Sequence, residues 1–375
     1  MTIGIICEYN PFHNGHLYHI NKIKEKYPDS TIILVMSGNF VQRGNISILN
    51  KWDKARIALD YGIDLVVELP FIYATQSADV FAFGAISILN KLRVNKLIFG
   101  SESNDVDKLK KLANVQLNNK NYDTLVKKYL NDGYNYPTAM NKALNNLIND
   151  DVNEPNDLLG LSYIKQIIMQ NSDIEVETIK RTNDFHSNRL DNSIVSATSI
   201  RKALVDNIDI SAYVPSKTKY YLDKINKDNN YFNYLKYKII SEGQHLNIYQ
   251  TVDEGIENRI LKYINKSNSL DELINNIKTK RYTYNKISRM MNHIICSFTK
   301  EEAQDKELKY IRLLGFNENG QKYINKIKKE LSITLISKQK QEYDSLLKID
   351  NRVDSIYDLI TNSNTLKHNI IKKEN

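Results

Sequence analysis

Two histidines near the amino terminus have the spacing of a phosphate-binding pair. His13 and His16 flank Gly15 in the run His-Asn-Gly-His, shortly after an apolar stretch that ends at Cys7. Residues three apart lie on one face of a helix, and both imidazoles can donate hydrogen bonds to phosphoryl oxygens. Gly15 lets the backbone approach a phosphate without an intervening Cβ. Such a pair would stabilise the charge that develops in nucleotidyl transfer, and ordinary capping or surface histidines are the alternative interpretation.

A second set of candidate phosphate ligands lies near residue 200. Ser199 and Arg201 belong to the run Ser-Ala-Thr-Ser-Ile-Arg, which we expect at or near the start of a helix. Backbone N–H groups at such a start and a guanidinium would suit a leaving pyrophosphate. The alternative is a hydroxyl N-cap followed by a surface arginine.

The elements that position these residues follow from the hydrophobic pattern. Short β-branched runs predict strands, and amphipathic runs between them predict helices. Their alternation predicts an α/β, Rossmann-like nucleotidylyltransferase domain whose parallel sheet is covered by helices. The first strand ends just before His13, where phosphates bind in this architecture. The expected strands are 2–7, 31–36, 65–69, 96–99 and 175–179, and the expected helices are 15–26, 53–60, 78–91, 159–169 and 197–205, with further helices between 106 and 148.

A change of composition near Pro215 predicts two domains, 1–214 and 215–375. Runs such as 271–278, 285–298 and 321–331 have helical spacing, so the second domain should be mostly α-helical. The chain carries 52 basic and 44 acidic side chains, of which residues 1–215 hold 23 and 24. The positive excess therefore lies entirely in the second domain.

A basic domain suggests a polyanionic partner, because lysine and arginine bind nucleic-acid phosphates by counterion release. Residues 278–289 interleave cations with tyrosines that could stack on unpaired bases. A solvated helix face is the alternative, and it is the favoured interpretation for a second cluster at 322–329. The candidate tRNA-binding residues are Lys278, Lys280, Arg281, Lys286 and Arg289.

Other features exclude several classes of protein. Cys7 and Cys296 lack metal-ligand spacing, so we expect neither a disulfide framework nor a protein metal site. The first apolar run is too short for a signal segment and no run is long enough to span a membrane, which favours a cytoplasmic protein. The first turn lacks Gly-x-Gly-x-x-Gly, which argues against a hydride-transfer enzyme.

Longer motifs occur in order along the first domain, at 6–16, 35–44, 67–70, 99–102, 155–160, 179–181 and 196–201. Together they resemble the tRNA(Met) cytidine acetate ligase family, within the His-x-Gly-His nucleotidylyltransferase superfamily. The resemblance implies that ATP and acetate form acetyl-adenylate. In such a reaction Mg²⁺ would shield the pyrophosphate. The acetyl group would then pass to N4 of the wobble cytidine of elongator tRNA(Met), giving N4-acetylcytidine. No protein nucleophile is needed, and an acyl-Cys7 intermediate has no base partner in the sequence.

The resemblance also implies a set of ATP contacts, with His13 and His16 as the catalytic pair. Gly100 would permit close approach of the adenosine, Asn156 would pair with polar edges of the nucleotide, and Arg181 would supply a fork for phosphate. A strand-end turn, a helix N-cap and a solvated charge are the respective alternatives. Ser37 and Lys165 are weaker candidates. The full set is Cys7, Glu8, Tyr9, Asn10, Pro11, Phe12, His13, Asn14, Gly15, His16, Leu17, Tyr18, His19, Ile20, Gly100, Asn156 and Arg181.

Two other functions remain open at this point. A small-molecule nucleotidylyltransferase of coenzyme synthesis would share the His-x-Gly-His run but would not need a basic helical domain. An RNA-binding module with a vestigial nucleotide site is the second alternative. Dependence on acetate and on tRNA separates the first from the ligase, and absence of ATP turnover would indicate the second.

Overall fold

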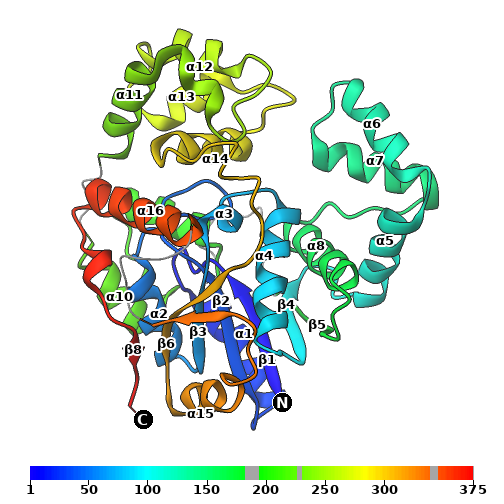
Figure 1. The fold of residues 1–375 in the computed structure, drawn as a ribbon, viewed down its shortest axis with the longest axis vertical. Coiled ribbons are helices and arrows are strands. Elements are labelled where there is room, and N and C mark those ends of the chain that lie inside the picture. The colour runs from blue at the N-terminus through cyan, green and yellow to red at the C-terminus, as the bar shows by residue number, and fades with distance from the viewer. Residues whose placement is uncertain (182–193, 226–229, 338–344, 375) are drawn as a thin grey trace.

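A mostly parallel β-sheet forms the centre of the chain (Figure 1). The structure, a computed structural model, describes residues 1–181, 194–225, 230–337 and 345–374. The strand order is β5-β4-β1-β2-β3-β6-β7, and β8 pairs with β6. The strands are β1 (Thr2–Cys7), β2 (Thr31–Ser37), β3 (Leu65–Leu69), β4 (Lys96–Ser101), β5 (Glu175–Lys180), β6 (Tyr310–Phe316), β7 (Thr334–Ile336) and β8 (Ile371–Lys372).

The expected Rossmann-like α/β fold is confirmed, with β1 to β5 at the predicted positions. Their side chains alternate between two cores: in β2, Ile33 and Val35 pack on one face while Ile32 and Leu34 pack on the other. Both faces are covered, as near-continuous apolar strands require. One face carries α1 (Asn14–Lys26), α2 (Lys51–Asp60), α9 (Ala197–Val205) and α10 (Ser216–Leu222), and the other carries α3 (Phe71–Ala74), α4 (Ala78–Lys91) and α8 (Pro155–Met169).

The strand order places a ligand site beside β1. This strand pairs in parallel with β2 on one side and β4 on the other, so the chain changes direction across the sheet here. In open α/β sheets, ligands bind at the carboxyl ends of the strands next to such a switch point. The loop of residues 8–13 leaves β1 at this place.

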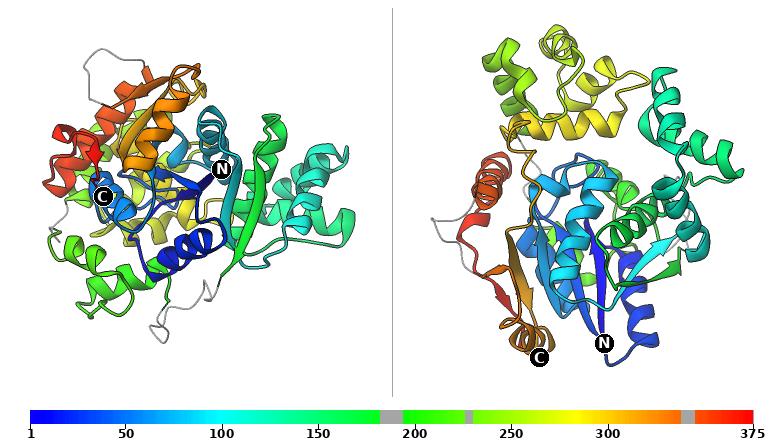
Figure 2. Two further views of the ribbon diagram at one scale, coloured as in Figure 1. Left: turned by 90° about the horizontal axis from the view of Figure 1, so that it is seen from below. Right: turned by 45° about the vertical axis from the view of Figure 1, so that its right-hand side comes forward.

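Two helical additions stand away from the sheet. Helices α5 (Val106–Asn118), α6 (Tyr122–Asn131) and α7 (Tyr136–Ile148) form the insertion expected between 106 and 148. Residues 231–295, the helical unit, stand above the carboxyl ends of the strands (Figures 1 and 2). The helical unit contains α11 (Tyr231–Glu242), α12 (Ile256–Ile264), α13 (Leu270–Ile277) and α14 (Tyr284–Ile295).

The remainder of the chain corrects one expectation. Residues 215–375 were expected to form a separate, mostly helical domain, but β6 returns to the sheet and pairs antiparallel with β3. Helices α15 (Glu318–Ile327) and α16 (Ser345–Thr361) follow β6 in the chain and pack around it and its neighbours. The division at 214 therefore does not separate the sheet from the rest of the chain.

Buried charges join this returning segment to the sheet. Lys51 Nζ lies 2.9 Å from Glu68 and 2.5 Å from Asp354, and Arg312 Nη1 lies 3.0 Å from Asp354. All four side chains are at most 9% exposed. Loss of one partner would leave an uncompensated buried charge, which typically costs about 3–5 kcal/mol.

Among the described residues, no helix is long and apolar enough to cross a membrane.

Candidate nucleotide site

His13 and His16 lie together at the start of α1. His13 is the N-cap residue, with extended backbone, and its Nδ1 accepts a hydrogen bond from Gly15 N at 3.0 Å. His16 Nδ1 in turn accepts from His13 N at 3.2 Å, which completes a capping box. The two ring centroids are 3.9 Å apart. The capping interpretation of these histidines is therefore correct, and it determines which ring nitrogens remain for a ligand.

The hydrogen bonds fix the protonation pattern of the pair. Because both Nδ1 atoms accept from backbone N–H groups, the neutral rings carry their protons on Nε2. Burial, together with the nearby charges of Arg181 and Arg201, lowers the pKa of His13 to about 3. Burial, His13 and Arg181 hold the pKa of His16 well below its usual value. Two neutral Nε2–H donors therefore stand at a helix N-terminus, a position that favours anions.

Gly15 is required by the stacking of His13 over the helix start. A Cβ at this position would lie 2.9 Å from Cε1 and 3.0 Å from Nδ1 of His13. Any side chain would therefore displace the ring that caps α1. The glycine of the His-x-Gly-His run thus positions a histidine as well as clearing space for a phosphate.

Arg201 reaches the same loop from α9. Its Nη1 donates to the carbonyl oxygen of Asn10 at 2.7 Å, so it is not the surface arginine of the alternative interpretation. Ser196, rather than Ser199, is the N-cap of α9, and its Oγ accepts from Ser199 N at 3.1 Å. Ser199 is buried beside it. The structure therefore brings Arg201 to the histidine loop, whereas Ser199 is buried at the start of α9.

Asn156 and Arg181 converge on Glu102, a residue that the sequence analysis did not single out. Asn156 Nδ2 donates to Glu102 Oε1, and Arg181 Nε lies 3.8 Å from the same oxygen. A Cβ at Gly100 would contact Arg181 Cγ at 3.4 Å. Asn156 is not a helix N-cap, since Glu154 caps α8, and the Arg181 side chain is only 23% exposed. Glu102 could have been found as the last residue of the 99–102 motif.

Lys54 is a second residue that sequence reasoning missed. Its side chain is completely buried, and Nζ donates to the carbonyl oxygens of Glu8, Ser37 and Gly38 at 2.8–3.0 Å. Lys54 thereby ties together the carboxyl ends of β1 and β2. Burial lowers its pKa to about 7. The same helix carries Lys51, Asp53 and Arg56, so its sequence does not distinguish Lys54 from a surface lysine.

The other residues of the 7–20 segment divide into buried and partly exposed positions. Tyr9, Phe12 and Ile20 are buried in the core, so their side chains support the loop. Burial raises the pKa of the Cys7 thiol to about 12, which keeps it protonated and unsuited to acyl transfer. Burial also lowers the pKa of His19 to about 4. Pro11 follows a cis peptide bond. Glu8 Oε1 accepts from Gln42 N, and Asn10 Oδ1 accepts from Ile48 N. The partly exposed residues on α1 are Asn14, Leu17 and Tyr18.

The two weaker candidates have structural partners. Lys165 pairs with Asp79 at 3.0 Å. Ser37 is fully buried at the end of β2, where its carbonyl oxygen accepts from Lys54. Neither side chain adds a cation to the histidine loop.

The candidate tRNA-binding residues split between surface and interior. Lys278 and Lys280 are exposed, and Arg281 pairs with Glu254 while donating to Leu130 O of the α5–α7 insertion. Lys286 Nζ lies 3.8 Å above the ring of Tyr282, which is buried and therefore presents no face to a base. Base stacking by Tyr282 is thus excluded by its burial.

Arg289 has an unexpected place, beside the nucleotide loop. Its Nη1 donates to Gln42 O at 3.1 Å, and Ser288 and Asn292 both donate to Gly44 O. These bonds dock α14 on the loop that follows β2. The 322–329 lysines instead lie on and just after α15, at the opposite end of the sheet (Figure 1).

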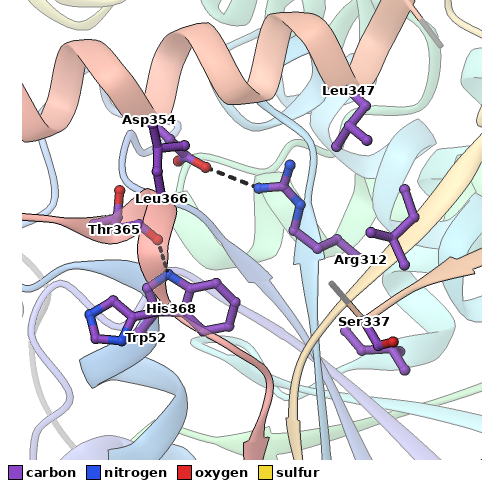
Figure 3. Close-up of a pocket in the computed structure, with 10 residues that line it drawn as sticks. Trp52, Arg312, Ser337, Leu347, Asp354, Thr365, Leu366 and His368 are labelled. Atoms are coloured by element: carbon purple, nitrogen blue, oxygen red, sulfur yellow. Dashed lines mark hydrogen bonds and ion pairs between the residues drawn. The ribbon is translucent and has the colours of Figure 1, made fainter. Parts of the chain in front are cut away.

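A small pocket between β6 and α16 is unrelated to this site. It is lined by residues that include Trp52, Arg312, Asp354 and His368, and it encloses about 20 Å³, room for about one water molecule (Figure 3). Trp52 Nε1 donates to Thr365 O at 2.7 Å across one side of it. This pocket is too small for a nucleotide.

Comparison with known proteins identifies the family. A family model described as HIGH Nucleotidyl Transferase matches residues 1–372. The tRNA(Met) cytidine acetate ligase of Caldicellulosiruptor saccharolyticus is 40% identical, covering 95% of this chain and 93% of the relative. That of Bacillus subtilis is 36% identical, covering 96% and 92%. The chain belongs to the tRNA(Met) cytidine acetate ligase family. The resemblance inferred from the ordered motifs is therefore confirmed.

Solved structures extend the similarity to the whole fold. Apo TmcAL of Thermotoga maritima has a TM-score of 0.91 and 27% identity, and the alignment covers 100% of both chains. A second structure of that protein, bound with alpha-thio ATP, has a TM-score of 0.89 over the same extent. The insertion and the helical unit thus belong to the cytidine acetate ligase architecture rather than to this chain alone.

Proposed function

We propose that this cytidine acetate ligase family member activates acetate with ATP and transfers the acetyl group to N4 of the wobble cytidine of elongator tRNA(Met). The products are N4-acetylcytidine, AMP and pyrophosphate. The observation that carries the proposal is the pair of neutral Nε2–H donors of His13 and His16, held at a helix N-terminus near Arg181 and Arg201. Names of full-length relatives support the choice of acetate and tRNA.

In the first step, an acetate oxygen attacks the α-phosphorus of ATP. The bond to the bridging oxygen breaks, and pyrophosphate leaves with the electron pair. His13 and His16 donate to the α-phosphoryl oxygens, whose charge grows in the transition state. Removal of one such donor from a preorganised site costs about 10²–10³ in rate. Arg201 and Ser199 receive the departing pyrophosphate at the start of α9.

The adenosine end of ATP lies toward β4 and β5. Gly100 leaves the strand end open, and Asn156 and Arg181 are held in place by Glu102. The bond from Asn156 Nδ2 to the Glu102 carboxylate fixes the orientation of the Asn156 amide. The amide oxygen makes no part of that bond, so it can accept a hydrogen bond from the nucleotide. These contacts select and orient the nucleotide.

We also propose that Mg²⁺ accompanies ATP. Among the described residues, no group of three or more His, Cys, Asp or Glu side chains could hold a metal ion. Mg²⁺ commonly keeps several waters and is bound through phosphates with one or two carboxylates. Here the triphosphate and water molecules would supply most of the ligands of Mg²⁺, and the metal would neutralise phosphate charge.

The helical unit provides the surface for tRNA. Lys278 and Lys280 are exposed on it, and its α14 contacts the loop beside the nucleotide site. Phosphates of the anticodon arm would bind these lysines while the wobble base enters the site from above. Because ATP and tRNA are cytoplasmic substrates, we place the reaction in the cytoplasm.

The test measures ATP–pyrophosphate exchange and acetylation by purified protein. Exchange that requires acetate, followed by N4-acetylcytidine only when elongator tRNA(Met) is present, is the expected result. His13→Ala should lower both by about 10²–10³. ATP cleavage indifferent to acetate and tRNA would indicate coenzyme synthesis instead, and absence of turnover would indicate an RNA-binding module.

A further inference from the structure

The second step needs a proton acceptor that the preceding description does not supply. When the N4 amine of cytidine attacks an acyl carbonyl, its nitrogen becomes cationic and must lose a proton. His13 and His16 cannot take that proton, because Nε2 already carries one and Nδ1 accepts a backbone hydrogen bond. Neither catalytic histidine is therefore available as the acceptor. This inference rests on the proposed function.

Glu8 is fixed at this edge by its surroundings. Its Oε1 accepts from Gln42 N at 2.8 Å, and its own carbonyl oxygen accepts from Lys54 Nζ at 3.0 Å. Among the described residues, Oε2 has no hydrogen-bond or ion-pair partner. The carboxylate thus has a fixed position and one oxygen free for a donor. The side chain is half-buried rather than enclosed.

The charge of Glu8 acts on three cations from different helices. Lys54 approaches from α2, Arg201 from α9 and Arg289 from α14, and Glu8 is the acidic group whose charge acts on all three. Arg201 also acts on His13, whereas Arg289 comes from the helical unit. Glu8 therefore lies between the phosphate-binding end of the site and the surface proposed to bring the RNA.

Other carboxylates at this edge are already engaged. Glu102 accepts from Asn156 Nδ2 and from Asp157 N, with one oxygen each. Glu68 is buried in ion pairs with Lys51 and Arg312. Neither of these two groups has an oxygen free for a substrate.

We propose that Glu8 is the catalytic residue that binds the N4 amine of the target cytidine and accepts its proton. A carboxylate is a natural acceptor for the cytosine N4 amino group. The N4 lone pair forms the new bond to the acetyl carbonyl carbon of acetyl-adenylate, and the carbon–oxygen bond to phosphate breaks. AMP leaves with that electron pair, one N4 proton passes to Glu8 Oε2, and the proton is later released to water.

The experiment compares the two steps in Glu8→Gln and Glu8→Asp. Glutamine keeps the oxygen that can accept from Gln42 N but cannot take a proton. The expected ratio of acetyl transfer to acetate-dependent ATP–pyrophosphate exchange falls about 100-fold in Glu8→Gln, within the usual range for loss of a general base. Glu8→Asp should recover part of that ratio. Glu25→Gln, an exposed position near the end of α1, is the matched control.

Acetohydroxamate formation in the presence of hydroxylamine distinguishes loss of the general base from misfolding of the variant. This strong nucleophile attacks acyl adenylates without a protein base, so Glu8→Gln should still yield acetohydroxamate in proportion to its exchange rate. A transfer-to-exchange ratio equal to that of the wild type would overturn the role of Glu8. Wild-type protein that gives neither acetate-dependent exchange nor acetohydroxamate would instead overturn the proposed function.

Discussion

The Nδ1 atom of His16 lies 3.2 Å from the backbone nitrogen of His13 and accepts its hydrogen. His13 Nδ1 likewise accepts from Gly15 N, so each ring uses one nitrogen to cap α1 and leaves the other for a ligand. Helix capping and catalysis are consequently assigned to different atoms of the same side chain. Substitutions that preserve one atom and remove the other can separate them.

His13→Asn should separate these roles, because asparagine is a good N-cap but lacks the Nε2 donor. We expect His13→Asn to unfold at nearly the wild-type temperature and His13→Ala to lose about 1 kcal/mol of stability. Both should lose about 10²–10³ in ATP–pyrophosphate exchange. Thermal denaturation and exchange assays on the two variants provide the measurement. Wild-type exchange in His13→Asn would mean that His13 only caps the helix.

Lys54→Met should weaken the junction between β1 and β2. The substitution leaves three buried carbonyl oxygens, of Glu8, Ser37 and Gly38, without their donor. Buried unsatisfied acceptors cost about 1–3 kcal/mol, and removal of a buried charge offsets part of this. We expect a loss of about 2 kcal/mol in urea unfolding and slower exchange. Lys22→Met, at an exposed lysine on α1, should change stability by less than about 0.5 kcal/mol, and equal losses in both variants would contradict this role.

Gly44→Ala should disturb the docking of α14. Gly44 has φ +86°, and a Cβ would lie 2.4 Å from Arg289 N. Gly133 is a matched control, since its φ is +88° but nothing lies within 4 Å of its Cβ position. Both alanines carry the cost of a left-handed backbone, about 1 kcal/mol, whereas only Gly44→Ala adds a steric clash of about 1–3 kcal/mol. Equal unfolding temperatures for the two variants would show that α14 can move away from the added Cβ without loss of stability.

Much of the fold follows from local pattern. Strands β1 to β4 could be predicted because each is a largely apolar run between turn residues, which predicts burial on both faces. The edge strand β5 could be predicted from its Val, Thr and Ile residues and from the alternation of strands and helices. The position of His13 after β1 likewise needed only the strand–turn–helix order. These features depend on neighbours in sequence.

The remainder depends on partners distant in sequence. Arg312 makes the β6 run look like a surface segment, because nothing nearby indicates that Glu68 and Asp354 neutralise it in the interior. Tyr282 looks available for stacking until the fold buries it, and Lys54 looks like a surface lysine until carbonyl groups from two strand ends meet it. In each case, tertiary contacts decide the burial of a polar or aromatic side chain.

Salt dependence should distinguish the surface lysines. Each lysine that neutralises an RNA phosphate contributes about 0.7–0.9 to the slope of log affinity against log salt. We expect Lys278→Ala combined with Lys280→Ala to lower that slope by about 1–2 between about 50 and 200 mM salt. Lys322→Ala with Lys326→Ala, on α15 at the far end of the sheet, is the control with the same charge change. Equal slopes for both double variants would place the tRNA elsewhere.

Buried histidines should make the fold sensitive to acid. Burial lowers the pKa of His13 to about 3 and those of His19 and His293 to about 4, all below the reference value of 6.5. Below pH 6.5 these histidines become protonated in the unfolded chain, but in the folded chain they stay neutral until about pH 4. Their contribution to the free energy of unfolding is therefore complete above pH 6.5 and decreases as the pH falls. Each histidine contributes a slope of about 1.4 kcal/mol per pH unit.

His293→Asn provides the test of this slope. His293 is fully buried, with its ring nitrogens 3.0 Å from Gln250 O and 2.9 Å from Thr75 O. Asparagine does not titrate, so the variant should be less stable at pH 7 yet lose stability more slowly between pH 6.5 and 4.5, by about 1.4 kcal/mol per unit. His245→Asn, at an exposed position, should keep the wild-type slope. Urea unfolding at several pH values measures the slopes of both variants. If the plots of stability against pH are parallel for wild type and His293→Asn, this imidazole is protonated in the folded chain and donates one N–H to each of the two carbonyl oxygens.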